Sequence, residues 1–239
     1  MDLKEFINSI VFSGLNPMEP GIILLTGSAK DPVPSLADLH MTVLPENNDK
    51  TKDLLKDICK IPRMSTFAIG AIINRIVSSL KNNAQFVNVG VWNGFTFFAG
   101  MASNETVPCV GIDNFSEFGG PRSAFLNRFK SVKSHHHFFY DMDYREYFAM
   151  RHSGPIGFYI YDGNHAREHQ CKGLQVAEPF FTEDCIIFID DINTPGPMEG
   201  TLDFIRQSKH KYEVLAEQRT AHNMHPTFWN GIALLKRIG

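Results

Sequence analysis

The sequence lacks the features that mark several broad classes of protein. No run approaches the ~18 apolar residues of a membrane-spanning helix, so no membrane contact is expected. The opening residues, MDLKEFINSIVFSG, have no basic segment followed by a long apolar stretch, which argues against a signal peptide. The 23 lysines and arginines do not outnumber the 26 aspartates and glutamates, so a broad basic face for nucleic acid is not expected.

Cysteine is also scarce, and none of the four cysteines forms a C-x-x-C pair. Cys109 and Cys185 lie inside apolar runs, which is typical of buried small side chains. We therefore expect reduced thiols and a cytoplasmic protein.

The remaining composition is that of a globular protein. The 239 residues are 43% hydrophobic and 21% charged, which excludes a disordered, collagen-like or coiled-coil chain. The length indicates one domain with an elaboration, or at most two small domains. The 20 phenylalanines predict an aromatic-rich core or a hydrophobic pocket.

Residues 1–63 differ from the rest of the chain and are predicted to form an N-terminal extension. Pro17, Pro20, Pro32 and Pro34 indicate irregular structure there, between short helical segments expected at 2–13 and 51–60. Residues 64–82 then carry apolar side chains at helical spacing, with Ser65 or Thr66 as the predicted cap.

From residue 85 onwards, apolar strand-like runs alternate with helix-like segments. This pattern predicts an α/β fold with a parallel sheet covered on both faces. The expected strands are 85–91, 107–113, 136–141, 156–162 and 184–191. Two further runs, 211–217 and 228–237, are separated by a loop too short for a helical crossover, so the last strand should be antiparallel.

Several predicted strands end in a glycine turn or an acidic residue, namely Gly90, Asp113, Asp162, Asp190 and Asp191. Ligands of open parallel sheets bind beyond the carboxyl ends of the strands. A row of carboxylates there predicts a site, although each aspartate alone has the alternative interpretation of a helix cap.

The first turn, NVGVWNG (88–94), follows a strand and opens a helix. Gly90 allows a ligand to approach the backbone, and Gly94 allows tight packing at the helix start. Asp113 lies about twenty residues on, where a carboxylate can accept hydrogen bonds from ribose hydroxyls. Together they indicate an adenosine-containing ligand.

Over residues 64–239 the sequence resembles the class I S-adenosylmethionine-dependent methyltransferases. The resemblance rests on NVGVWNG, VGIDNF (110–115), YDGNH (161–165), FIDD (188–191) and the antiparallel last strand. It implies a Rossmann-like, doubly wound seven-stranded sheet that binds S-adenosylmethionine. Asn88 stands where the family commonly has an acidic residue. The implied cofactor-binding residues are Asn88, Gly90, Val91, Trp92, Gly94, Asp113, Asn114 and Asp143.

The second half is similar to the metal-dependent O-methyltransferases of the macrocin and mycinamicin type. That resemblance implies that Asp162, Asp190 and Asp191 bind Mg²⁺ or another divalent cation, for which oxygen ligands are suited. Asp162 and His165 would be catalytic, with His165 taking the proton because its reference pKa is near neutrality. Asn164 stands where that group often has an acid.

The expected function is therefore O-methylation of a small sugar-like or phenolic acceptor, assisted by a divalent cation. We expect residues 1–63 to form a substrate-side cap, and the acceptor pocket to combine them with the 192–200 loop. His222 and His225 are interpreted as surface-loop residues, with a place at the border of the pocket as the alternative. Trp92 is interpreted as either a cofactor contact or core. A nicotinamide-dependent oxidoreductase and a non-catalytic cofactor-binding protein are the alternatives, and a homo-oligomer is left open.

Overall fold

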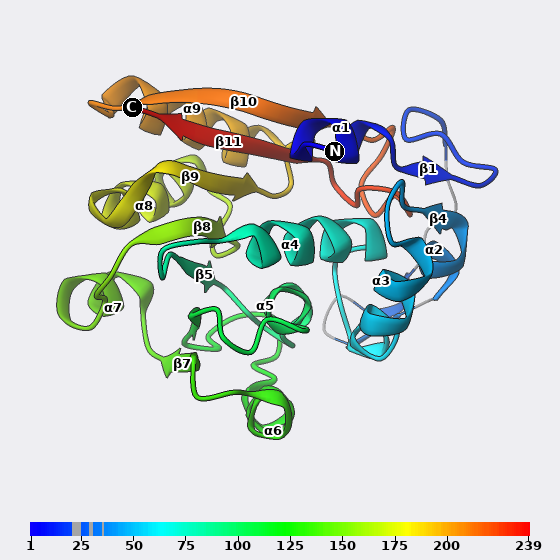
Figure 1. Ribbon diagram of the computed structural model, residues 1–239, viewed down its shortest axis with the longest axis horizontal. Helices are drawn as coiled ribbons and strands as arrows, with labels where there is room; N and C mark the ends of the chain where they lie inside the picture. Colours follow the sequence, from blue (N-terminus) through cyan, green and yellow to red (C-terminus); the bar gives the residue numbers. More distant parts are fainter. Residues whose placement is uncertain (21–24, 29–30, 35) are drawn as a thin grey trace.

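The central sheet has seven strands in the order β10-β11-β9-β8-β5-β6-β7 (Figure 1). The structure is a computed structural model, and it describes residues 1–20, 25–28, 31–34 and 36–239. The five strands of the parallel part are β5 (Gln85–Val89), β6 (Cys109–Asp113), β7 (His137–Asp141), β8 (Ile156–Tyr161) and β9 (Phe181–Ile189). Each coincides with an expected strand, so the α/β prediction is confirmed.

The C-terminal hairpin supplies the antiparallel strand. It consists of β10 (Lys211–Gln218) and β11 (Ile232–Ile238). Strand β11 inserts between β9 and β10 and is antiparallel to both. The loop at 219–231 is therefore brought to the edge of the sheet at which the parallel strands end.

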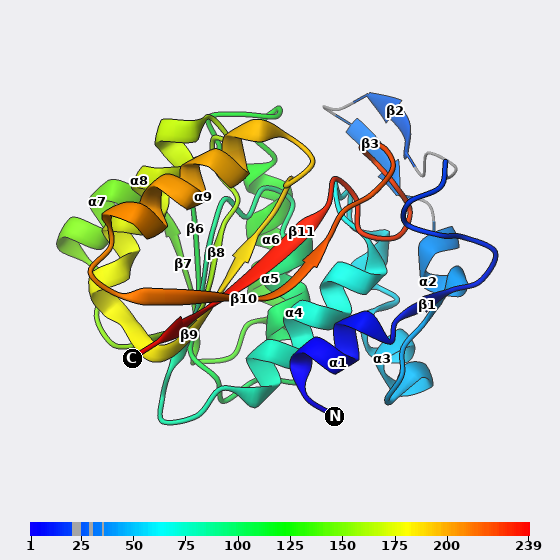
Figure 2. The ribbon, with the colours of Figure 1, turned by 90° about the horizontal axis from the view of Figure 1, so that it is seen from above.

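Helices cover the two faces of the sheet in separate groups (Figure 2). The helices of one face are α4 (Phe67–Ser79), α5 (Phe95–Met101) and α6 (Arg122–Val132), and those of the other are α7 (Tyr144–Met150), α8 (Arg167–Ala177) and α9 (Pro195–Gln207). Of the two predicted caps of α4, Ser65 and Thr66, the structure has Thr66, whose side-chain oxygen caps the helix.

Two hydrophobic cores result, one on each face of the sheet. Because side chains alternate along a strand, Phe86 of β5 packs in one core and Val87 in the other. The first core is rich in phenylalanine, as expected, and the rings of Phe97 and Phe125 stack within it at 6.4 Å. All four cysteines are buried and unbridged.

The N-terminal extension is more regular than its prolines indicate. Two short antiparallel ladders form there, and proline is tolerated in such two-stranded edges. The elements are α1 (Leu3–Asn8), β1 (Val11–Phe12), β2 (Leu25–Ser28), β3 (Asp31–Pro34), α2 (Ala37–Met41), β4 (Thr42–Val43), α3 (Asn48–Leu55) and the 3₁₀ helix η1 (Ile58–Lys60). The helix expected at 2–13 is thus shorter, and the one at 51–60 is divided in two.

A buried ion pair joins the extension to the rest of the fold. Both terminal nitrogens of Arg63 donate to the carboxylate of Asp38 on α2, each at 2.8 Å. Asp38 also accepts a 2.6 Å hydrogen bond from the backbone N–H of Phe67, the first residue of α4. The Arg63 guanidinium lies over the ring of Phe95, 5.1 Å from its centre. The pair therefore fixes α2 against the start of α4.

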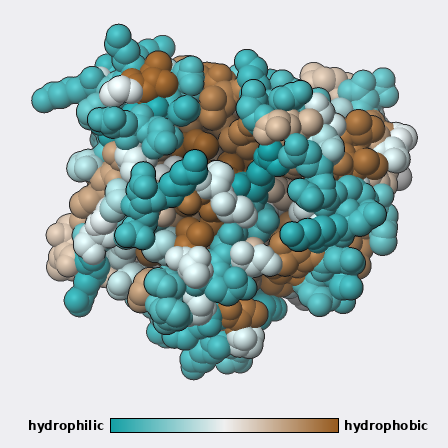
Figure 3. Space-filling view, viewed as in Figure 1, coloured by the Kyte–Doolittle hydropathy of each residue, from teal (hydrophilic) through white to brown (hydrophobic). Residues whose placement is uncertain are grey.

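Within the described ranges, no helix is long and apolar enough to cross a bilayer. On the face seen in Figure 3, hydrophilic residues surround separate hydrophobic patches.

Replacing Asp38 by alanine should strongly destabilise the protein. The change leaves the Arg63 guanidinium buried without its carboxylate, so the free energy of unfolding should fall by about 3–5 kcal/mol in urea denaturation. Asp57→Ala is the matched control, because Asp57 pairs with Lys60 at the surface, where such a pair contributes about 1 kcal/mol or less. Equal losses in the two variants would contradict this role of the pair.

Candidate active site

A cavity of about 890 Å³ opens at the carboxyl ends of the parallel strands. It lies where the strand order reverses, between β5 and β8. Most of the predicted site residues line it together, namely Gly90, Val91, Trp92, Asp113, Asn114, Asp143, Asp162, His165, Asp190 and Asp191. The row of strand-end acids is thus gathered around one cavity.

The glycine turn after β5 forms the centre of this edge. Gly90 has a φ of +79°, and a side chain there would place its Cβ 1.8 Å from the carbonyl oxygen of Asp162. Only glycine fits, because both the backbone conformation and the space exclude a side chain. Gly94 has a φ of +100°, precedes α5 and packs against the ring of Phe98. It does not line the cavity, so its role is in the conformation of the turn.

Asn88 also lies behind the turn. Its side chain is fully buried and does not line the cavity. The amide oxygen accepts a 2.8 Å hydrogen bond from the hydroxyl of Thr96, which does line it. The structure therefore gives Asn88 a supporting position in place of the direct cofactor contact expected from the sequence.

Asp113 connects two loops of the cavity wall. Its carboxylate accepts hydrogen bonds from the backbone N–H of Trp92 at 2.8 Å and of Phe115 at 2.6 Å. Burial raises the pKa of Asp113, while these N–H groups favour its charged form. Each carboxylate oxygen keeps a further acceptor position, which can take hydroxyl donors.

Asp143 borders the same cavity at the β7 side. It caps α7 by accepting from the backbone N–H of Arg145 at 2.8 Å and pairs with the guanidinium of that residue at 2.9 Å. The hydrogen bonds from Arg145 lower the pKa of Asp143, so this side chain is a carboxylate. Asp143 is thus both a helix cap and a cavity residue.

His165 lies between two of the predicted cation ligands. Its Nδ1 is 3.0 Å from Asp191 Oδ2, and its Nε2 is 3.3 Å from Asp162 Oδ1. Burial alone would lower the pKa of His165, but the hydrogen bonds and charges of the two aspartates raise it to about 11. Both ring nitrogens of His165 thus face carboxylates in this arrangement, and its role as the base stays a prediction.

Asp190 completes the acidic group. Its Oδ1 is buried and has no hydrogen-bond partner among the described residues. Burial, followed by the charges of Asp191 and Asp162, raises the pKa of Asp190 well above its ordinary value. Asp191 is further engaged, because its Oδ1 accepts from the side chain of Asn230 at 2.7 Å.

These contacts decide how the predicted cation ligands fit a metal ion. The imidazole stands between Asp162 and Asp191, so the three carboxyl groups do not converge on one point. In the described part of the chain, no group of three or more histidine, cysteine, aspartate or glutamate side chains is arranged to hold a metal. The arrangement therefore does not fit the divalent cation that the resemblance implies.

Helix α9 sets the position of His165 through close backbone packing. A Cβ on Gly196 would lie 2.2 Å from the carbonyl oxygen of His165, and one on Gly200 would lie 2.4 Å from that of Arg167. Residues 192–200 thus hold the site from behind. None of them lines the cavity, so the expectation that this loop builds the acceptor pocket is wrong.

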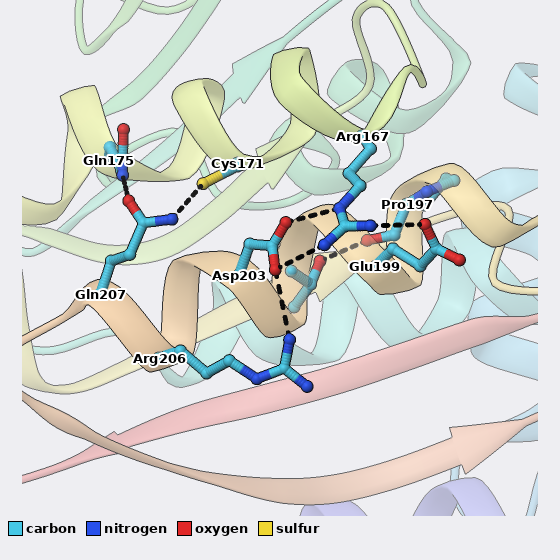
Figure 4. A network of polar contacts seen from close by, with 9 residues as sticks. Arg167, Cys171, Gln175, Pro197, Glu199, Asp203, Arg206 and Gln207 are labelled. Atoms are coloured by element: carbon cyan, nitrogen blue, oxygen red, sulfur yellow. Dashed lines mark hydrogen bonds and ion pairs between the residues drawn. The ribbon is translucent and has the colours of Figure 1, made fainter.

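Polar contacts along the outer side of α8 and α9 support this packing (Figure 4). Arg167 pairs with Asp203 at 2.6 Å and with Glu199 at 3.2 Å. Such exposed pairs add little stability.

The loop between β10 and β11 supplies site residues that the sequence interpretation missed. Asn223, Met224, Trp229 and Asn230 all line the cavity. His225 is fully buried and lies 3.0 Å from the carbonyl oxygen of Glu19, so its interpretation as a surface residue is wrong. An available signal was the predicted antiparallel last strand, which returns this loop to the carboxyl edge.

The reversal point, the glycine turn and the acid after the second strand define a Rossmann-like cofactor domain. Residues 87–192 match the sequence profile of a family described as a methyltransferase domain. This part of the chain is therefore similar to a methyltransferase domain. No curated protein sequence gives a significant match.

Solved structures share the fold at low identity. A candidate S-adenosylmethionine-dependent methyltransferase from Streptococcus mutans has a TM-score of 0.51 and 15% identity, over 69% of this chain and 47% of that one. A candidate O-methyltransferase from Klebsiella pneumoniae has a TM-score of 0.54 and 9% identity, over 87% of this chain and 92% of that one. TomG from Streptomyces achromogenes is an O-methyltransferase of tomaymycin synthesis that was solved with S-adenosylmethionine. It has a TM-score of 0.51 and 11% identity, over 81% of this chain and 90% of that one. The chain spans about half the length of the S. mutans protein.

Replacing Asp113 by alanine should weaken cofactor binding. The variant loses the carboxylate that is predicted to accept from ribose hydroxyls, and with it the link between the Trp92 and Phe115 loops. We expect the Kd for S-adenosylhomocysteine, measured by calorimetry, to rise at least about ten-fold. Asp184→Ala, at an exposed position of β9 outside the cavity, should leave the Kd unchanged. An unaltered Kd in Asp113→Ala would refute the assignment.

The stability that His165 contributes should depend on pH. Its folded pKa of about 11 exceeds the ordinary value of 6.5, so this contribution is full below 6.5 and is lost as the pH rises towards 11. In metal-free buffer with EDTA, the difference in unfolding free energy between the wild type and His165→Gln should shrink from about pH 6 to about pH 9. Nitrogen NMR should show the ring doubly protonated throughout, and a ring that titrates near neutrality would contradict the geometry.

Proposed function

We propose that the protein is an enzyme that transfers a methyl group from S-adenosylmethionine to a hydroxyl of a small sugar-like or phenolic acceptor. One observation carries the proposal. The same cavity contains the Gly90 turn with Asp113, suited to the adenosyl group, and Asp162 beside His165, suited to a hydroxyl. Its volume of about 890 Å³ is within the range of pockets that hold a drug-sized ligand.

The residues present fit the cofactor. Gly90 allows close approach, Asp113 would accept from the ribose hydroxyls, and Asp143 would border the adenine. Carboxylates along the cavity also favour a positively charged donor. When bound, S-adenosylmethionine supplies an electrophilic methyl group on a sulfonium.

Asp162 is the group that we assign to the acceptor hydroxyl. It lines the cavity at the reversal point, held by a 2.9 Å hydrogen bond from its backbone N–H to Val89 O. Its carboxylate would orient the hydroxyl and take its proton as the oxygen–methyl bond forms. His165 acts as a positioning residue, because its imidazolium holds the carboxylates of Asp162 and Asp191.

The N-terminal extension is proposed as the substrate-side cap. Arg63 at its end lines the cavity, and two backbone carbonyls of the extension contact the β10–β11 loop. Pro17 O accepts from the backbone N–H of Ala221 at 2.8 Å, and Glu19 O lies 3.0 Å from His225 Nε2. These contacts support a wall built jointly by both ends of the chain.

The divalent cation stays a prediction from the resemblance, and no step of this proposal requires it. A cation bound by Asp162 and Asp191 together would need the His165 ring to leave its present place. Turnover measured with EDTA and with added Mg²⁺ distinguishes a reaction that needs no divalent cation from one that requires it.

The proposal is tested by incubating the protein with S-adenosylmethionine and a panel of glycosides and catechols. Mass spectrometry should find an O-methylated product together with S-adenosylhomocysteine. Asp162→Asn should lower kcat at least about a hundred-fold, the usual contribution of a positioned acid or base, with cofactor affinity retained. Cofactor binding without transfer to any acceptor would favour the non-catalytic alternative. Methylation at nitrogen or carbon alone would refute O-methylation.

A further inference from the structure

The cavity has two ends that differ in chemistry. Asp113 follows β6 and Asp191 follows β9, and three strand spacings of ~4.8 Å place these strands roughly 14 Å apart. With the adenosyl group at β6, the β9–β11 side is left for the acceptor. We name it the acceptor end, and its residues are Met64, Ser65, Asp162, His165, Asp190, Asp191, Asn223, Met224, Trp229 and Asn230.

Negative charge exceeds positive charge at the acceptor end. Within this set, the carboxylates of Asp162 and Asp191 outnumber the imidazole of His165, so the sum over the set is negative in either protonation state of His165 and of Asp190. A further histidine, His169 of α8, also lines the cavity. The neighbouring cation, Arg63, is matched by the carboxylate of Asp38.

The other described side chains of the acceptor end are neutral. Asn223, Asn230 and Ser65 offer amide and hydroxyl groups, and Trp229 and Met224 offer apolar surface. Among the described lining residues, the remaining arginine is Arg145, which pairs with Asp143 near β7. The described part of the wall therefore presents no lysine, and no arginine lacking a carboxylate partner, to an anionic acceptor.

We propose that the acceptor is an uncharged hydroxylated molecule, and that the acceptor end selects against carboxylates, phosphates and coenzyme A thioesters. The inference rests on the proposed function, because it assigns this end to the acceptor. An anion placed there meets like charges in a partly buried site, where repulsion is weakly screened. Neutral hydroxyls can pair with the amides and carboxylates at no such cost.

Isosteric probes test the selection without requiring turnover. The chain's two tryptophans, Trp92 and Trp229, both line the cavity, so Trp92→Phe leaves Trp229 as the reporter at the acceptor end. In EDTA and saturating S-adenosylhomocysteine, fluorescence titrations would compare 3,4-dihydroxybenzamide with 3,4-dihydroxybenzoate, and glucuronamide with glucuronate. At least one amide should bind at least about ten-fold more tightly than its carboxylate, and this ratio should fall in high salt.

A positive charge added at Met224 should weaken the selection. Met224→Lys, in the same Trp92→Phe background, should reduce the amide-to-carboxylate ratio at least about three-fold, since the lysine offsets one carboxylate. Val214→Lys is the control, because Val214 is exposed on β10 and outside the cavity.

The outcomes separate this inference from the proposed function. Amide preference that is sensitive to salt and to Met224→Lys supports it, even if no methyl transfer is found. Equal binding, tighter binding of the carboxylates, or no binding of either amide overturns it, even if O-methylation occurs.

Discussion

The reversal of strand order between β5 and β8 is the constraint on which the site depends. Helix α5 follows β5 onto one face of the sheet and α8 follows β8 onto the other, so the chain diverges at the carboxyl ends and leaves an opening. At this point the backbones of Gly90 and Asp162 nearly touch, and Asp162 N–H donates to Val89 O. The cofactor turn and the carboxylate assigned to the acceptor are thereby held by two neighbouring strands, which gives the rigid placement that methyl transfer requires.

Gathering carboxyl groups at one edge carries a desolvation cost, and the structure offsets it group by group. Backbone N–H groups donate hydrogen bonds to Asp113, and Arg145 forms an ion pair with Asp143. The imidazole of His165 lies between the carboxylates of Asp162 and Asp191. Asp190, left without a partner among the described residues, has its pKa raised instead. A divalent cation at Asp162 and Asp191 would have to displace this imidazole from both carboxylates.

Local patterns predicted the strands, the antiparallel direction of the last strand and the row of strand-end acids, because periodicity and connection length determine these. They could not predict the Asp38–Arg63 pair or the buried His225, whose partners are distant in sequence. The contact between His165 and Asp191 could not be predicted for the same reason, because these residues are distant in sequence. The position of Asn88 was predictable in principle, because alternation along β5 places it on the face of Phe86, towards α5.

The two ends of the cavity also differ in their origin within the chain. The adenosyl side and the strand-end acids belong to residues 87–192, the part that matches the methyltransferase domain profile. The acceptor end is completed by Met64 and Ser65 and by the 223–230 loop, which lie outside that match. Thr66 ties these segments together by donating its hydroxyl hydrogen to Thr227 O at 2.7 Å. Acceptor selection can therefore change through these flanking segments while the cofactor turn is left intact, so a shared fold carries the donor chemistry but not the identity of the acceptor.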